Sequence, residues 1–307
     1  MSLTERDSLT VAAGEDAPTG PIPTDAAIHT TAAIEVAGPC PDDTGGALST
    51  MLPTLDPLAK PLRAVGDFFA MTLDTFVLMV RPPFAWREYL LQTWFVARVS
   101  VLPAVMMTIP YAVLLTFIFN ILLTDIGAGD FSGTGSAIAT VNQIGPVVTV
   151  LVVSGAGSTA MCADLGARTI REELDALRVM GVNPIQSLVV PRVLAATTVS
   201  LALGGAVTMM GLTGSYLFSV YIQHISPGAF VTGLTTLTGA GDVIVSMVKA
   251  TLFGMAAGLI ACYKGISVGG GPAGVGNAVN ETVVFTFMVL FLINIIVTAV
   301  GIQFTVQ

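Results

Sequence analysis

The sequence predicts an all-α membrane protein, with interfacial N-terminal elbow helices followed by five transmembrane helices. Of its 307 residues, 53% are hydrophobic and only 10% are charged, and the mean hydropathy is +0.83. Soluble domains carry about a quarter charged residues, so an aqueous fold of this length has too little interior for so much apolar sequence. Five apolar stretches are also long enough to cross about 30 Å of hydrocarbon as helices.

The first 57 residues are predicted to form a disordered, acidic, cytoplasmic tail. Residues 1–58 hold nine acids against Arg6 alone, a net charge of −8, whereas acids and bases balance in the remainder. The tail is rich in Thr, Ala, Pro, Gly and Asp and has no aromatic residue, so it buries too little apolar surface to offset ordering. It has no basic region followed by an apolar core, so we do not expect a cleaved signal peptide.

Residues 58–98 are expected to lie at the membrane surface. Phe68, Phe69, Leu73 and Phe76 fall on one side of a helical pattern, which Arg81-Pro82-Pro83 interrupts. The following segment mixes aromatic residues with arginines, a composition typical of the membrane–water interface. A sixth span within Phe68–Val80 is the chief alternative, although about thirteen residues is short for a span.

The five spans are predicted at 99–123, 138–163, 188–220, 243–263 and 282–304, within a domain that covers 99–307. The loops 124–137 and 221–242 hold no lysine or arginine, whereas the N-terminal region and the loop 164–187 are basic. The positive-inside rule then places the N-terminus in the cytoplasm and the C-terminus outside the plasma (inner) membrane.

The loop 164–187 carries a short amphipathic helix in its middle. Thr169 and Glu172 fit a capping box, Gly181 suits the C′ position, and Leu174, Leu177 and Met180 form an apolar stripe. The candidate coupling residues are the charged ones: Arg168, Arg171, Glu172, Glu173, Asp175 and Arg178. Since the chain has no GxxxxGK[ST] motif, ATP hydrolysis by a P-loop would need a partner chain. The residues alone leave two interpretations, a helix that caps two spans or a docking surface for a motor domain.

Several ordered motifs resemble the MlaE/YrbE permease family of Mce-type ABC lipid transporters. They are the run from Glu172 to Pro184, which is similar to the family's EExDA loop, the runs 144–149 and 188–194, and the glycine-containing runs 254–263 and 269–276. The sequence of residues 155–168 is similar to that of actinobacterial, especially mycobacterial, A-type members of the family. The match covers roughly the chain from Leu62 to its C-terminus.

The resemblance implies a transporter subunit with no catalytic residue, no metal and no cofactor of its own. Its implied partners are a B-type YrbE paralogue in a heterodimer, a cytoplasmic ABC ATPase on the 168–184 loop, and extracytoplasmic Mce proteins. The implied cargo is a hydrophobic lipid: a fatty acid, mycolic acid, phospholipid or sterol.

A small set of polar residues at membrane depth is the candidate lipid path. It consists of Asn142, Gln143, Lys249 and Asn294. Gram-negative relatives carry an Arg-Glu pair where this chain has Asn142-Gln143, and an acid where it has Asn294, so a lysine–carboxylate network does not carry over. Lys249 either belongs to this cluster, pairs with a partner subunit, or snorkels outward.

Two further predictions concern packing. Gly254 and Gly258 form a GxxxG pair, which favours close helix packing within the bundle over a dedicated dimer seam. Glu281 is interpreted as an acid at the N-terminus of the last span.

Two other functions are weighed against transport. An intramembrane hydrolase would need a serine with a base, a zinc motif or paired aspartates at depth, and the spans offer none of these. A non-transporting scaffold subunit of the same complex stays open.

Overall fold

Every regular element of this computed structural model is a helix, within the described residues 56–81, 85–127, 132–237 and 239–305. The predictions for residues 1–55 lie outside them. The elements are α1 (Asp56–Met79), α2 (Trp86–Asp125), α3 (Ser132–Ala139), η2 (Thr140–Ile144), α4 (Gly145–Val152), η3 (Val153–Gly157), α5 (Ser158–Ile170), α6 (Glu173–Val179), η4 (Ile185–Val189), α7 (Val190–Tyr221), α8 (Pro227–Leu237), α9 (Ala240–Ile266) and α10 (Pro272–Thr305). The three η elements are π-helical turns.

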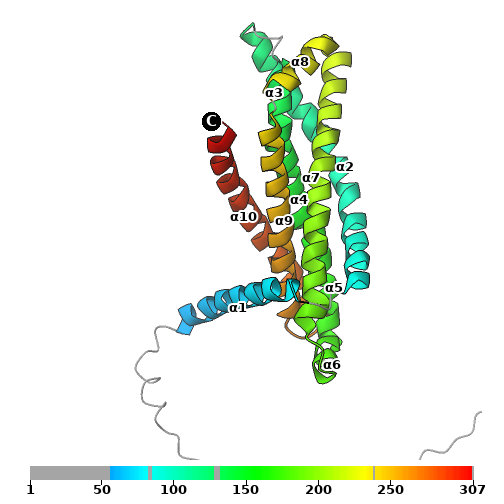
Figure 1. The fold of residues 1–307 in the computed structure, drawn as a ribbon, viewed down its shortest axis with the longest axis vertical. Helices are drawn as coiled ribbons and strands as arrows, with labels where there is room; N and C mark the ends of the chain where they lie inside the picture. Colours follow the sequence, from blue (N-terminus) through cyan, green and yellow to red (C-terminus); the bar gives the residue numbers. More distant parts are fainter. Residues whose placement is uncertain (1–55, 82–84, 128–131, 238, 306–307) are drawn as a thin grey trace, which may run out of the picture. The chain divides into compact units, whose positions relative to one another are not determined.

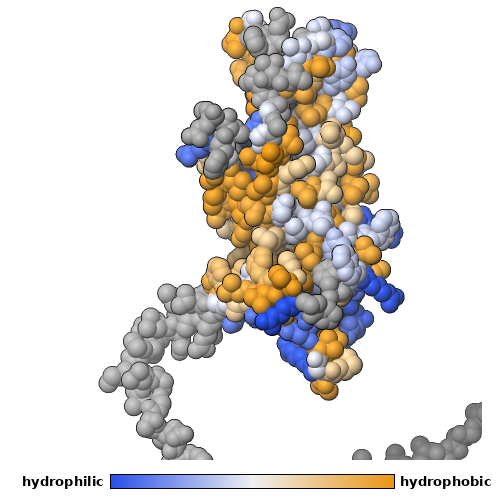
Figure 2. Space-filling view, viewed as in Figure 1, coloured by the Kyte–Doolittle hydropathy of each residue, from blue (hydrophilic) through white to orange (hydrophobic). Residues whose placement is uncertain are grey.

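Five helical runs are long and apolar enough to cross a membrane, which confirms the predicted fold class. They are Trp86–Asp125, Thr140–Ile170, Ile185–Tyr221, Gly241–Ile266 and Pro272–Gly301. Figure 1 shows α6 at one end of the long helices and α3 and α8 at the other. In the space-filling view, polar side chains gather toward the α6 end, and apolar side chains cover much of the surface above it (Figure 2).

Helix α1 lies across the long helices near the α6 end (Figure 1). The Phe68 ring packs edge-to-face on Tyr263 of α9, with centroids 5.4 Å apart, and the Tyr263 hydroxyl donates to the Ala64 carbonyl at 2.9 Å. Phe69 and Leu73, which neighbour Phe68 on the same side of the helical pattern, are exposed. Exposed apolar side chains beside the bundle contact are suited to burial in the membrane surface.

Two helix starts differ from expectation. Helix α2 runs unbroken from Trp86, so the second elbow segment and the first span are one helix of 40 residues. Pro103 and Pro110 lie inside it, which membrane helices tolerate because neighbouring groups satisfy the freed carbonyls. Helix α10 begins at Pro272, where proline fits the first helical turn, so Gly274 and Gly276 are helical rather than part of a glycine-rich loop.

Two of the π turns precede prolines. Turn η2 ends just before Pro146 of α4, and η4 ends just before Pro191 of α7. Proline has no N–H to donate and its ring crowds the preceding carbonyls, so the turn before it widens. The helix continues through each widened turn, so the second span is one continuous helical run, Thr140–Ile170.

Helices α2 and α7 run parallel and pack through a stripe of small and hydroxyl residues. On α2 the buried residues recur every fourth position: Gln92, Val96, Ser100, Ala104, Thr108, Ala112, Thr116 and Asn120. The Thr116 hydroxyl donates to Ser215 Oγ at 2.8 Å, and Asn120 Nδ2 donates to Ser219 Oγ at 3.5 Å and to Gln223 Oε1. Such interhelical bonds contribute about 0.6 kcal/mol each within a membrane.

Candidate functional site

The loop between the second and third spans folds into α6, a helix of seven residues set off from α5 by a sharp turn. Glu172 occupies the N-cap with φ 58°, in the left-handed region that few residues other than glycine adopt. The predicted capping box at Thr169 is wrong, because Thr169 lies in the last turn of α5. Its hydroxyl donates to the carbonyls of Leu165 and Gly265 at 2.9 and 3.0 Å. The tertiary bond to Gly265 holds α5 helical as far as Ile170.

The C-terminal end of α6 follows the prediction. Gly181 has φ +77°, its N–H donates to the Arg178 carbonyl at 3.0 Å, and the Val182 N–H donates to the Leu177 carbonyl at 3.0 Å. These two bonds define a Schellman motif, in which glycine is favoured at C′ because it has no Cβ.

One side of α6 is anchored and its tip is free. Leu174 is buried, and Leu177 packs beside it against the cluster formed by Leu165, Val189 and Val193. Beyond them, three apolar side chains are exposed: Val179 (89%), Met180 and Val182. The expectation that Met180 joins the inward apolar stripe is therefore wrong. In Figure 2 apolar side chains stand beside the polar surface at this end.

The charged side chains around α6 form local pairs. Asp175 Oδ1 accepts from Arg178 Nη1 at 2.9 Å, and Arg171 Nε lies 3.4 Å from Glu173 Oε1. Both pairs are well exposed, so each contributes well under about 1 kcal/mol to stability. Arg171 thus pairs with Glu173 and not with Asp175, which lies four residues further along the chain. These pairs therefore contribute little to holding the helix.

Arg168 lies apart from α6, in an ionic network around the buried Arg192 that the sequence did not predict. Arg192 of α7 is fully buried, and its Nη2 lies 2.5 Å from Asp164 Oδ2 and 3.9 Å from Glu88 Oε1. Arg168 approaches the same two acids, at 3.5 Å from Asp164 and 3.9 Å from Glu88. Two arginines and two acids balance, as a buried charge requires.

This network, which we call the Arg192 network, joins three helices. Glu88 begins α2, Asp164 and Arg168 end α5, and Arg192 begins α7. Arg192 Nη1 also donates to the Leu188 carbonyl at 3.0 Å, and Gln92 Nε2 donates to Glu88 Oε1 at 3.0 Å. Since α6 follows α5 after two residues, the network is connected to α6 by a short stretch of chain.

The four polar residues predicted at membrane depth have different environments. Lys249 (2% exposed) and Asn294 are buried, Asn142 is half-buried, and Gln143 is exposed. Within the described part of the chain no hydrogen bond joins any two of them, and Asn294 Oδ1 has no partner. Lys249 also has no ion pair with any described residue. The nearest acid along α9 is Asp242, which caps the helix by accepting from the Gly239 N–H at 3.2 Å. The burial of Lys249 argues against snorkelling.

Gly254 and Gly258 lie at the contact between α9 and α7 of the same chain. A Cβ on Gly254 would stand 2.5 Å from the Ala196 carbonyl oxygen and 2.6 Å from Thr197 Cα. A Cβ on Gly258 would stand 3.1 Å from Val193 Cα. Both glycines allow the two backbones to touch, so this motif packs the bundle.

Glu281 does not lie in the first turn of a helix. Because α10 begins at Pro272, Glu281 comes after more than two turns, and its Oε2 accepts from Lys264 Nζ at 2.6 Å. The helix-dipole interpretation is therefore wrong. The residue pairs the end of α9 with α10, and Lys264 also stands 4.7 Å over the Phe285 ring.

Five candidate spans and an anchored helical loop with an exposed tip define a multi-pass membrane protein. The chain belongs to the MlaE permease family, whose model, "Permease MlaE", matches residues 89–300.

Curated relatives agree with this family. A probable ABC transporter permease protein of Rickettsia conorii is 31% identical over 248 residues, covering 78% of this chain and 92% of the relative. The intermembrane phospholipid transport system permease protein MlaE of Haemophilus influenzae is 26% identical over 181 residues, covering 59% and 69%. The chloroplastic protein TRIGALACTOSYLDIACYLGLYCEROL 1 of Arabidopsis thaliana is 29% identical over 176 residues, covering 57% and 50%.

Proposed function

We propose that this chain is the membrane permease subunit of an ABC-type lipid transporter, driven by a separate ATPase that docks on α6. The observation that carries the proposal is the exposed tip of α6 on an anchored base. Monomeric surfaces rarely hold large apolar side chains together without a partner, and here Val179, Met180 and Val182 stand beside charged residues. A central apolar contact with a polar rim is the usual composition of a protein interface.

The docking residues we propose are Arg171, Glu172, Glu173, Asp175 and Arg178. Arg168 is also proposed as a coupling residue, and it contacts Asp164 and Glu88 in the Arg192 network. Force applied to α6 would reach α5 through the two-residue turn at Arg171 and Glu172 and then act on α2 and α7 through that network.

The proposed orientation puts α6 in the cytoplasm. The long helices carry their arginines toward the α6 end, as at Arg87, Arg168 and Arg192, while the described residues around α3 and α8 include Asp125, His224 and Asp242 but no lysine or arginine. By the positive-inside rule the α6 end faces the cytoplasm and the C-terminus faces outward.

Lipid is proposed as the cargo for two reasons. The Haemophilus influenzae relative is named for phospholipid transport, and the spans offer apolar surfaces rather than charged pathways. Fatty acids, mycolic acids, phospholipids and sterols share the chemistry that such a path accepts. The proposed assembly contains a B-type YrbE paralogue and extracytoplasmic Mce proteins, as in the A-type permeases that the sequence resembles.

Asn142, Gln143, Lys249 and Asn294 are proposed to line the lipid path in this assembly. Gln143 is exposed and therefore available to a second subunit or to a lipid headgroup, whereas Asn294 Oδ1 is buried without a hydrogen-bond partner. Lys249 supplies a buried positive charge at that depth, and a charge inside a membrane is a functional feature by default.

Copurification tests the assembly. The solubilised full chain should bring down an ATPase subunit, a second permease and Mce proteins. Lipid movement by the chain alone, with no ATPase present, would overturn the proposal.

Charge reversal tests the docking surface. Glu173→Lys with Asp175→Lys should reduce ATPase recovery at least tenfold while leaving the thermal midpoint of the permease nearly unchanged, because both side chains are exposed. Glu281→Lys is the matched control at the same end of the bundle. Full ATPase recovery with the double variant would show that α6 is not the dock.

A further inference from the structure

A pocket of about 390 Å³ lies between α7 and α9, on the part of the bundle nearer α8. It arises because the two helices touch along one half of their length and separate along the other. At Gly258 and Gly254 the backbones are in contact, and a Cβ on Gly204 would still meet Ala250 Cβ at 2.9 Å. Beyond Gly204 and Ala250 the helices part, and most of the pocket lies on that side of the contact, with Leu201 at its deep end.

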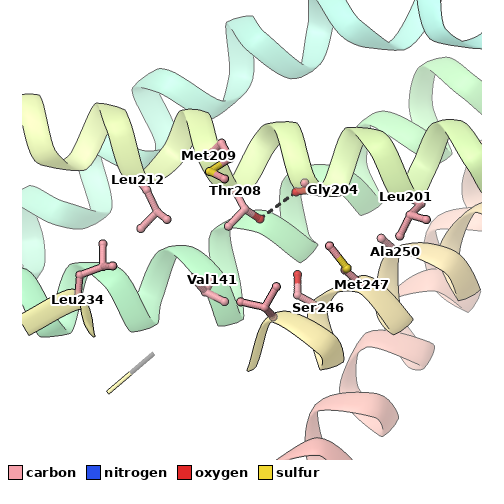
Figure 3. A pocket seen from close by; sticks show the side chains of 12 residues that line it. Val141, Leu201, Gly204, Thr208, Met209, Leu212, Leu234, Ser246, Met247 and Ala250 are labelled. Carbon is pink, nitrogen blue, oxygen red and sulfur yellow. Dashed lines mark hydrogen bonds between the residues drawn. The ribbon is translucent and has the colours of Figure 1, made fainter. Parts of the chain in front are cut away.

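The walls of the pocket are apolar. Figure 3 shows side chains from both helices pointing into the gap, including Leu201, Leu212 and Met247, with Val141 of η2 behind them and Leu234 of α8 at the mouth. The polar side chains are two hydroxyls. Thr208 already donates to the Gly204 carbonyl at 2.9 Å, and Ser246 stands opposite. No lining residue is charged.

The depth of the pocket matches one leaflet. Asp242 and Lys264 begin and end the apolar part of α9, and 22 residues of helix between them span about 33 Å, the thickness of the hydrocarbon core. Ala250, at the deep end, lies eight residues or about 12 Å from Asp242. The pocket therefore extends from the membrane surface on the α8 side nearly to the midplane.

An apolar void of this size is unfavourable unless something fills it. Protein interiors are close-packed, and water needs two to four polar partners, which these walls do not offer. At this depth in the membrane, the apolar material that surrounds the protein is lipid hydrocarbon. Met209 and Met247 of the lining are exposed, so the pocket is open to the surrounding lipid, and an apolar pocket within one leaflet can take an acyl chain.

We propose that this pocket binds one acyl chain of a phospholipid from the leaflet on the α8 side, with the terminal methyl at Gly204 and Ala250 and the headgroup near Leu234. The site concerns binding alone, so it stands whether or not the chain works with an ATPase.

Photolabelling tests the proposal. The assembled complex is reconstituted in phosphatidylcholine vesicles that contain a phosphatidylcholine with a diazirine either at the end of one acyl chain or near its ester, and labelled peptides are mapped after irradiation. The chain-end probe should label Leu201–Gly205, and the ester-proximal probe should label Leu212 and Val243. Each should exceed the label per residue on the exposed face of α10, at Phe285–Ile296, by at least threefold.

A pair of glycine variants supplies the control. A Cβ on Gly205 or on Gly214 meets nothing within 4 Å, and both lie on α7, but only Gly205 lines the pocket. Gly205→Leu should cut chain-end labelling at least fivefold, and Gly214→Leu should not. Ser246→Leu, from the facing wall, gives an independent block if Gly205→Leu fails to assemble.

Three outcomes would overturn the assignment. Pocket labelling no greater than that of α10 would mean ordinary lipid contact or occupation by a partner's side chains. Equal labelling of the two glycine variants would place the probe elsewhere. Labelling by a diazirine-bearing free fatty acid but not by the phosphatidylcholine probe would exclude the phospholipid source.

Discussion

Replacing Asp164 by asparagine is expected to destabilise the protein by about 3 kcal/mol. The change keeps the shape of the side chain and removes the carboxylate that lies 2.5 Å from the fully buried guanidinium of Arg192. Arginine cannot lose its proton, so a buried charge is left with Glu88, at 3.9 Å, as its nearest acid. Breaking a fully buried pair costs about 3–5 kcal/mol, and the partial exposure of Asp164 (29%) places this one at the lower end.

Thermal unfolding in detergent measures the effect. For a domain of this size each 1 kcal/mol shifts the midpoint by about 2–4 °C, so the variant should melt roughly 6–12 °C below the wild type. Asp175→Asn is the matched control, because Asp175 pairs with Arg178 at the surface, where the side chains are 69% and 61% exposed. Its midpoint should fall by no more than about 3 °C.

A second substitution separates charge from packing. If the destabilisation comes from the uncompensated guanidinium, adding Arg192→Met to Asp164→Asn should recover part of the lost midpoint, since an apolar side chain of similar length suits a buried site. Equal midpoints for Asp164→Asn and Asp175→Asn, or a further fall on adding Arg192→Met, would refute the account of the Arg192 network.

Three further outcomes follow from the described geometry. Gly254→Ala should lower the thermal midpoint, since its Cβ would meet the α7 backbone and overpacking costs about 1–3 kcal/mol, whereas Gly214→Ala, in open space, should not; equal effects would contradict the close contact. Gly181→Ala should strain the Schellman turn by about 1–2 kcal/mol and speed hydrogen exchange in α6 at least fivefold, with unchanged exchange counting against the strain. Lys249→Met should leave stability equal or higher, because it removes a buried unpaired charge, yet abolish lipid transfer in reconstituted vesicles; unimpaired transfer would remove Lys249 from the proposed path.

The spans were predictable because hydropathy and length decide them. Each predicted span lies within a long helical run of the structure, apart from a few residues at the ends. The C-terminal end of α6 was also predictable from the sequence, because the positive φ of Gly181 depends on the glycine itself and not on distant contacts. The boundary at Thr169 was not, because a tertiary bond to Gly265 outweighs the capping preference of threonine.

The Arg192 network was harder to find because its members lie far apart in the sequence. One local signal was present. Asp164 and Arg168 are four residues apart on one helix, and Arg192 falls at the start of an apolar run, where a charge needs a partner. Only the fold shows that Glu88 completes the group. The pocket had no sequence signal at all, since it depends on where α7 and α9 separate.

The π turns affect how this chain should be aligned with others. A π turn holds one more residue than the α turn it replaces, and the helices on either side keep their packing faces. A relative that is one residue shorter within Thr140–Ile144 would have the same faces before and after the gap. For such a relative, an alignment without a gap through this segment would assign Asn142 and Gln143 to the wrong residues. A single-residue length difference there is better understood as loss of the wide turn than as an error in either sequence.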